Sequence, residues 1–282
     1  MDQAVWLAQV NETVLDPDLP ICDPHHHLWD HPGSRYLLDE LLGDTGSGHN
    51  VVSTVFVECA SMYRADGPDA LKPVGETEFV NRHAVGWDAA DSVRNSHTNP
   101  TQGLLLDSTF RKGFAELGKR GLSFDAWLYH PQIPQLTDLA RAFPGTTIIL
   151  DHFGGPLGVG PYEGKRAEIF VYWKEAIRDL AACPNVVAKL GGIAMPINGF
   201  GFHKRERPAT SAELVAATGD YYRHAIDCFG PQRCMFESNF PVDKASCSYR
   251  TLWNSFKKIA AGASASEKAA LFHNTAARVY RL

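Results

Sequence analysis

Short apolar runs alternate with longer amphipathic stretches along this chain of 282 residues. Several runs are continuous, such as those over 51–57 and 147–150. Continuous apolar runs are typical of strands that are buried on both faces of a parallel sheet. We therefore expect seven strands: Ile21–His25, Val51–Ala60, Arg82–Trp87, Phe124–Tyr129, Thr146–His152, Asn185–Leu190 and Arg233–Ser238.

Helical spacing of apolar residues separates these strands. It predicts helices over Phe110–Lys119, Ala167–Ala181 and Ser211–Phe229, and a last helix that begins with the capping-box spacing Ser264/Glu267. Alternating strands and helices indicate βαβ units. The first strand ends in three histidines and lacks a Gly-rich phosphate loop, so we expect a closed (β/α)8 TIM barrel, in one domain over 1–282, rather than an open doubly wound sheet.

One βα unit is missing from this count, because a TIM barrel has eight strands. The helical pattern of Pro73–Asn81 runs directly into the strand pattern of Arg82–Trp87. A connection between a helix and a strand normally takes about 2–6 residues. We expect a segment of roughly 30–50 residues, including the third βα unit, to be absent near Asn81/Arg82. A seven-stranded or gapped barrel is the alternative.

Composition and charge narrow the class of protein. The formal net charge is −5, so no broad basic field favours nucleic acid as a partner. No apolar run approaches the roughly 18 residues of a membrane span, and no signal-peptide pattern is visible. The cysteines lack paired spacing, which is typical of reduced residues in a cytoplasmic protein. The sequence leaves open whether the chain forms a homo-oligomer.

The strongest chemical signal lies at the end of the first strand. His25 and His27 share one face of a strand, whereas His26 points away. At the mouth of a barrel, two imidazoles on one strand form a platform for a divalent metal. A surface histidine cluster is the alternative interpretation.

Two further strand ends carry polar side chains. His152 follows the strand of 146–152 and precedes Gly154-Gly155, where the backbone can turn tightly beside a substrate. Glu237 and Asn239 lie on one face of the last strand, with Glu237 one layer deeper in the barrel. Glu58 is a further carboxylate at a predicted barrel mouth, either catalytic or a partner for a nearby cation.

Three motifs together resemble the amidohydrolase superfamily, and within it the amidohydrolase 2 branch of lactonases and related decarboxylases. They are Asp-x-His-x-His-x-Trp over 23–29, Leu-Asp-His-x-Gly-Gly-Pro over 150–156 and Ser-Asn-Phe-Pro over 238–241. The resemblance implies that His25 and His27 bind one divalent metal, Zn or Mn, and that His152 binds the metal or polarises the substrate. Asn239 stands where the family has an aspartate that contacts the metal and serves as general base. An amide has no charge to offer a cation and too little basicity to act as a general base. Glu237 or another carboxylate then takes the base role, or the mechanism differs, or the metal binds weakly or not at all.

Residues around the predicted mouth suggest a small anionic substrate. Arg82 at a strand end and His203 with Arg205 in a later loop offer cations, and His130 offers a further acid, base or ligand. Trp29, Trp87 and Trp127 offer flat walls for a ring, and the loop over 88–104 is a candidate lid.

We expect a hydrolase that opens a small, carboxylate-bearing lactone. One alternative is a metal-dependent decarboxylase of an aromatic or unsaturated acid. The other is a non-catalytic binding protein on a decayed barrel.

Overall fold

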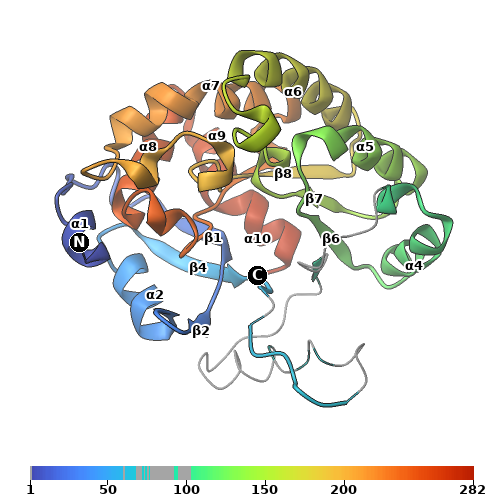
Figure 1. Cartoon of the computed structure of the whole chain (residues 1–282). Coiled ribbons are helices and arrows are strands. Elements are labelled where there is room, and N and C mark those ends of the chain that lie inside the picture. Colours follow the sequence, from blue (N-terminus) through green and yellow to red (C-terminus); the bar gives the residue numbers. More distant parts are fainter. Residues whose placement is uncertain are drawn as a thin grey trace.

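The computed structural model describes residues 2–59, 61–67, 72, 74, 76, 92–94 and 103–282. Among them, seven parallel strands form a curved array (Figure 1). The strands are β1 (Ile21–His26), β4 (Val51–Phe56), β5 (Ser92–Arg94), β6 (Ser123–Ala126), β7 (Ile148–Leu150), β8 (Val186–Leu190) and β9 (Cys234–Phe236). A short antiparallel hairpin, β2 (Trp29–His31) and β3 (Ser34–Tyr36), follows β1.

Backbone hydrogen bonds give the order of the strands. Strands β5 to β9 form one continuous parallel sheet in sequence order, and β1 pairs with β4. The two sheets meet where β9 ends, because the amide of His27 donates to Phe240 (2.8 Å) and the amide of Asn239 donates to His25 (2.9 Å). The carboxyl ends of β1 and β9 therefore lie side by side.

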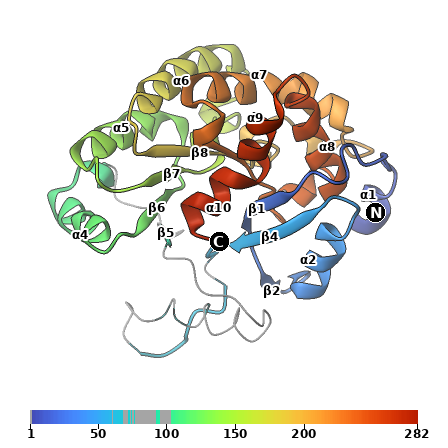
Figure 2. The ribbon, with the colours of Figure 1, turned by 180° about the vertical axis from the view of Figure 1, so that it is seen from behind.

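Helices cover the outer face of this array (Figures 1 and 2). They are α4 (Ser108–Lys119), α5 (Ile133–Ala142), α6 (Arg166–Ala181), α7 (Ser211–Phe229) and α8 (Tyr249–Ile259), with α1 (Gln3–Leu7) and α2 (Leu38–Thr45) near the N-terminus. The largest core lies between these helices and the strands and includes Trp173, Tyr222 and Phe236.

The C-terminal segment fills the inner face of the array. It comprises α9 (Ala265–Ala269), a π-helical turn over Ala270–Asn274 and α10 (Thr275–Tyr280). Ala276 and Tyr280 of α10 pack against a layer of inward-facing residues from the strands: Cys22, Val55, Ile149, Val187 and Met235. This layer separates α10 from the polar side chains nearer the carboxyl ends of the strands.

The parallel α/β class is confirmed, and six of the seven predicted strands contain an observed strand or overlap one. The predicted capping box of Ser264 and Glu267 is also present, although the helix it begins is interrupted by the π-helical turn. Nearly all of Pro73–Asn81 and the whole of Arg82–Trp87 lie outside the described residues. Between β4 and β5, the described residues form no ladder, so closure into eight strands stays a prediction.

The proposed lid over 88–104 was wrong in part. Residues Ser92–Arg94 form β5, which pairs in parallel with β6. A strand of three residues gives too little periodicity to separate it from a polar loop.

Among the described residues, no helix has the length and apolar character to cross a bilayer.

Candidate metal and catalytic centre

His25 and His27 face each other at the carboxyl end of β1. Their Nε2 atoms are 3.2 Å apart. The Nδ1 atom of His27 lies 2.8 Å from the carbonyl oxygen of Val57, which can only accept, so Nδ1 carries the hydrogen and Nε2 presents a lone pair. The ring of His26 instead contacts Thr54 Oγ1 on β4 (3.1 Å), away from this pair, and burial lowers the pKa of His26 to about 3.

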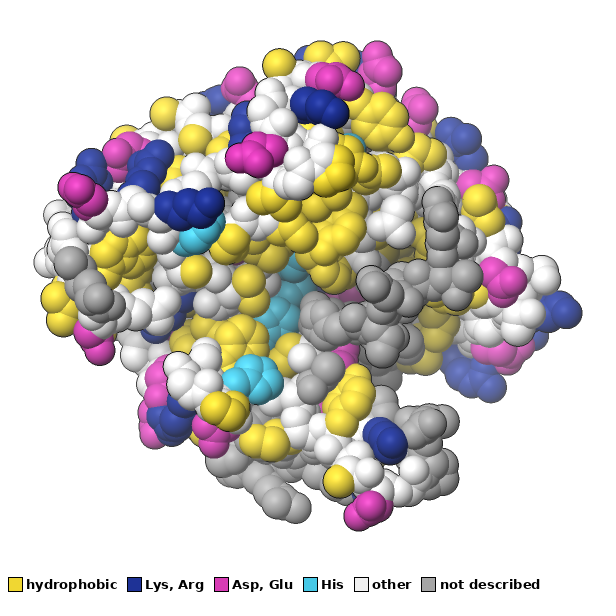
Figure 3. All heavy atoms as spheres, in the orientation of Figure 1, with side chains coloured by type: hydrophobic (Ala, Val, Ile, Leu, Met, Phe, Trp, Pro, Cys, Tyr) yellow, Lys and Arg dark blue, Asp and Glu magenta, His cyan; other side chains and the backbone are white. Residues whose placement is uncertain are grey.

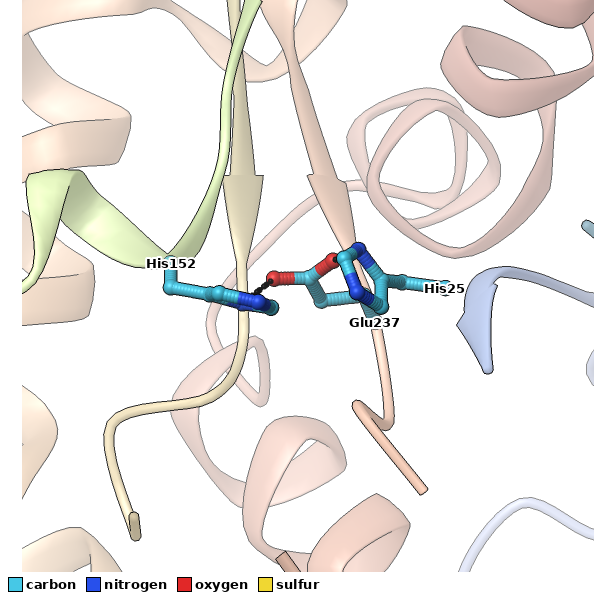
Figure 4. A group of neighbouring side chains, drawn as sticks. All are labelled: His25, His152 and Glu237. Atoms are coloured by element: carbon cyan, nitrogen blue, oxygen red, sulfur yellow. Dashed lines mark hydrogen bonds and ion pairs between the residues drawn. The ribbon is translucent and has the colours of Figure 1, made fainter. Parts of the chain in front are cut away.

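Glu237 lies between two histidines from opposite sides of the array (Figure 4). Its Oε2 is 3.0 Å from His25 Nδ1, and its Oε1 is 2.6 Å from His152 Nδ1. Glu237 is fully buried. The hydrogen bond from His152 Nδ1 to Glu237 fixes the tautomer of that ring and directs its Nε2 the other way, whereas His25 Nδ1 lies at ion-pair distance from the same carboxylate.

The position of the His152 side chain requires glycine directly after the neighbouring strand, β8. His152 follows β7 with φ of 51°. A Cβ atom on Gly192 would lie 2.4 Å from His152 Nδ1, and one on Gly191 would lie 2.2 Å from the carbonyl oxygen of Glu237. The two glycines after β8 therefore leave the space in which the His152–Glu237 contact forms.

These side chains fit a divalent metal. His25, His152 and Glu237 each offer a ligand atom, and these atoms lie within 4.8 Å of one another. The Nε2 atoms of His25 and His27 are also spaced as two ligands on one tetrahedral ion would be, given bonds of about 2.0–2.1 Å. Because both Nδ1 atoms next to Glu237 lie at hydrogen-bond distance from its oxygens, we interpret Glu237 as the carboxylate that orients the rings.

A second set of buried charges lies directly beneath the histidines. Lys189 on β8 contacts Asp125 Oδ2 (2.9 Å) on β6 and Asp151 Oδ1 (3.3 Å), which follows β7. Burial raises the pKa of Asp151 to about 6, although Lys189 opposes this shift. Burial alone would lower the pKa of Lys189, but Asp125 and Asp151 raise it above its ordinary value.

The sequence analysis did not assign Asp125, Asp151 or Lys189 to the site. A signal was available, because each is a charged residue within or directly after an apolar strand. Burial of a charge is costly unless it is paired. Such residues in neighbouring strands are therefore expected to meet.

Asn239 lies beside Asp243 at the end of β9. Asn239 has φ of 54°, and its amide nitrogen donates to Asp243 Oδ1 (3.3 Å). This bond leaves the amide oxygen as the group that Asn239 can present to a ligand. Burial raises the pKa of Asp243 well above its ordinary value.

Two tryptophans flank the histidine cluster. The ring of Trp29 stacks on His27 with centroids 6.0 Å apart, and the ring of Trp127 meets His152 edge to face at 4.7 Å. In the space-filling view, histidine side chains are visible in a hollow near the centre of the face, beneath hydrophobic side chains (Figure 3). The surroundings suit a ring with a flat apolar face.

Two other predicted residues, Glu58 and His130, have the following contacts. Glu58 accepts from the hydroxyl of Tyr63 (2.5 Å). His130 is buried, its Nδ1 accepts from the amide of Leu157 (3.3 Å), and its ring packs on Tyr162.

Two arginines of the loop after β8, Arg205 and Arg207, pair with a carboxylate of α7. Arg205 pairs with Glu213 (3.5 Å) at the start of that helix. His203, two residues before Arg205 in the sequence, is partly buried. Arg82 and Trp87 lie outside the described residues. No contact in the described part of the chain joins Arg205 to the histidine cluster, so its role in binding substrate stays a prediction.

Comparison with known proteins identifies the class. The Amidohydrolase family matches residues 80–282. An uncharacterised protein of Sinorhizobium fredii is 33% identical, with 94% of this chain and 99% of that protein covered. The chain therefore belongs to the amidohydrolase family and is an enzyme of the hydrolase type.

More distant relatives include an enzyme of named activity and proteins of known structure. L-fucono-1,5-lactonase of Burkholderia multivorans is 30% identical over 177 residues, which is 62% of this chain and 57% of that enzyme. The crystal structure of an amidohydrolase from Burkholderia multivorans with bound Zn superposes with a TM-score of 0.74 at 24% identity, covering 93% of this chain and 99% of that one. Amidohydrolase 2 from Bifidobacterium longum subsp. infantis gives a TM-score of 0.65 at 22% identity, over 94% and 99% of the two chains. The parallel α/β fold of this chain is therefore similar to that of solved amidohydrolases.

Proposed function

We propose that this enzyme hydrolyses a small lactone at the cluster of His25, His27, His152 and Glu237. The observation that carries the proposal is the buried carboxylate of Glu237, which lies within 3.0 Å of Nδ1 of both His25 and His152. The similarity to L-fucono-1,5-lactonase supports a lactone as the substrate class. Family membership supports an enzyme over a non-catalytic protein on a decayed barrel.

His25 and His27 are the residues that would hold a divalent metal, through Nε2. Val57 fixes the ring of His27, and Glu237 favours the tautomer of His25 in which the two lone pairs face each other. The bound Zn of the Burkholderia multivorans amidohydrolase supports zinc as the metal, with Mn as the alternative. When bound, a divalent cation supplies Lewis acidity toward a carbonyl oxygen.

His152 and Glu237 would move the proton. Because Nδ1 of His152 donates to Glu237 at 2.6 Å, its Nε2 is the basic atom. The buried carboxylate stabilises the imidazolium that forms when Nε2 takes a proton from the attacking water. The ring then returns this proton to the alkoxide that leaves when the ester C–O bond breaks. This dyad supplies the base that Asn239 does not.

The expected product is a hydroxy acid, formed by addition of one water across the ester. Trp29 and Trp127 would flank the lactone ring. The sequence predicts that Arg82 binds a carboxylate of the substrate, and such a carboxylate stays part of the proposal.

We also propose that the strands belong to an eight-stranded barrel from which the third βα unit is missing. The match to the Sinorhizobium fredii protein runs over 324 residues, more than the 282 of this chain. That relative therefore carries internal residues without a counterpart here. The absent ladder between β4 and β5 in the described part of the chain supports a position for the gap near Asn81/Arg82.

A panel of lactones tests the proposed function. Sugar-derived 1,5-lactones and lactones that carry a carboxylate are incubated with Zn²⁺-loaded or Mn²⁺-loaded enzyme, and acid release is followed in a pH-stat. We expect hydrolysis of at least one class, and loss of this activity in His152→Asn with little change in Zn²⁺ affinity. Release of CO₂ from an aromatic or unsaturated acid, without lactone hydrolysis, would replace the proposal with a decarboxylase.

A further inference from the structure

A charged layer of Asp125, Asp151, Lys189 and Glu237 separates the histidines from the apolar interior. All four side chains are at most 1% exposed. Asp151, Lys189 and Glu237 each follow an apolar inward-facing residue by two positions, after Ile149, Val187 and Met235. The pleat of the strands therefore stacks these three residues directly on the core around α10.

The layer holds three carboxyl groups and one ammonium group. When the carboxyl groups are ionised, its negative charges outnumber its positive charge. Buried charges are costly unless they are compensated. A divalent cation bound directly above would supply compensating charge.

Lys189 also reaches the first histidine of the pair. Its Nζ lies 3.2 Å from His25 Nδ1, the same atom that lies 3.0 Å from Glu237 Oε2. An ammonium can only donate, so a bond from Lys189 requires a lone pair on Nδ1 and places the hydrogen on Nε2. A bond to Glu237 requires the hydrogen on Nδ1 and leaves the lone pair on Nε2.

Only the second of these two tautomers suits a cation at the histidine pair. In the first, the Nε2 hydrogen of His25 points at His27, whose Nε2 is 3.2 Å away. Lys189 thus favours the tautomer of His25 that binds no metal, and Glu237 favours the one that does.

Contacts from two directions hold Lys189 in this position. Asp125 accepts from Lys189 and also from the hydroxyl of Tyr280 on α10 (2.8 Å). The ring of Tyr280 lies beneath the ammonium, 5.1 Å from Nζ. The C-terminal helix therefore fixes the ammonium under the site.

We propose that Lys189 is a positioning residue that weakens cation binding at His25 and His27 while it stabilises the metal-free fold. Its ammonium supplies positive charge to the layer before a cation binds, and it competes with the cation for His25. The inference rests on the proposed function in taking this pair as the cation site, and it is independent of which lactone is the substrate.

The experiment measures Zn²⁺ affinity in chelator-stripped protein by competition with a chromogenic chelator. Lys189→Met removes the ammonium and keeps a side chain of similar length. We expect Zn²⁺ to bind at least about tenfold more tightly. The repulsion between two positive charges a few Å apart changes a binding constant by more than tenfold, even at an effective dielectric constant of about 20. The metal-free variant should melt at a lower temperature than the wild type, and Zn²⁺ should recover more of its stability.

Lys257→Met is the matched control. Lys257 is also buried and also donates to a histidine Nδ1, that of His49 at 2.8 Å, but it lies on α8. Its loss should leave the Zn²⁺ affinity unchanged. Asp151→Asn provides the opposite charge change and should weaken Zn²⁺ binding.

Each outcome decides the inference. Equal or weaker Zn²⁺ binding by Lys189→Met, with Zn²⁺ bound by the wild type, overturns the role of Lys189 and leaves the proposed function standing. If Lys189→Met does not fold without metal, Asp151→Asn decides, and an unchanged affinity overturns the inference. Failure of the wild type to bind Zn²⁺ overturns both this inference and the metal in the proposed function. Co²⁺ absorption spectra provide a second readout, since a changed environment of His25 shifts the d–d bands.

Discussion

The Nε2 atoms of His25 and His27 lie 3.2 Å apart at the end of β1, and their Nδ1 atoms face oxygen acceptors. When His25 carries its hydrogen on Nδ1, the two imidazoles present two lone pairs to one point. The backbone alternation of a strand brings the rings together, and contacts from β4 and β9 fix their rotation. The geometry of the pair therefore depends on three strands that are distant in sequence.

Replacement of either ring should abolish metal binding. In His25→Asn or His27→Asn, we expect Zn²⁺ affinity to fall by about a hundredfold or more, because one of two fixed nitrogen ligands is lost. Equilibrium dialysis followed by metal analysis measures the effect. His26→Asn is the matched control, since its ring contacts Thr54 instead. Equal losses in all three variants would show that the motif acts through folding alone.

Glu237→Gln should weaken both the metal site and catalysis. The neutral amide removes the negative charge beside His25 and weakens the hydrogen bond that His152 Nδ1 donates, so the tautomers that suit metal binding and catalysis are less favoured. Loss of an orienting partner typically costs about 10–100-fold in metal affinity or activity. Isothermal titration with Zn²⁺ and the kcat of lactone hydrolysis measure the two effects. A variant with full affinity and full kcat would remove Glu237 from the site.

Gly192→Ala should displace His152. The new Cβ would lie 2.4 Å from His152 Nδ1, at a φ of 69°. We expect kcat to fall about tenfold or more, since small displacements of catalytic groups are costly. Gly121→Ala is the matched control, because Gly121 has φ of 66° and open space around a Cβ. Both variants should lose about 1 kcal/mol of stability to the left-handed backbone, but only Gly192→Ala should lose activity.

Stability should fall in mild acid because of a histidine far from the site. Burial and the nearby Lys257 lower the pKa of His49 to about 4. In the unfolded chain, His49 takes up a proton below its ordinary pKa of about 6.5, whereas in the folded chain it does so only near pH 4. The stability that neutral His49 contributes is therefore fully present above pH 6.5 and is lost as the pH falls toward 4.

Urea denaturation at several pH values measures this loss. We expect His49 to contribute about 2 kcal/mol of the change in unfolding free energy over this range. His49→Gln should show a correspondingly smaller change with pH than the wild type. Parallel curves for the two proteins would exclude His49 as the cause.

The sequence predicted the parallel class of the fold because its strands are nearly continuous apolar runs. It could not separate β5 from a polar loop, and it did not find the hairpin of β2 and β3, whose three-residue strands carry little pattern. Alternation along β1 also predicted that His25 and His27 share a face.

The contacts across the array were beyond sequence reasoning. Glu237 was expected one layer below Asn239, but its position between His25 and His152 depends on the curvature that brings β7, β9 and β1 together. Lys189 meets its two aspartates because β6, β7 and β8 lie side by side in the sheet, and its long side chain reaches Asp125, which the register aligns with Ile149 and Val187. The roles of Glu58, His130, His203, Arg205, Arg82 and Trp87 stay predictions.

The most direct test of the account is lactone hydrolysis by the wild type and by the double variant His25→Ala/His27→Ala, each stripped of metal and then supplied with Zn²⁺ or Mn²⁺. The account predicts that a lactone of the panel is hydrolysed by the metal-supplied wild type, that stripping abolishes the activity, and that the double variant stays inactive with metal present. Undiminished hydrolysis by the double variant would contradict it.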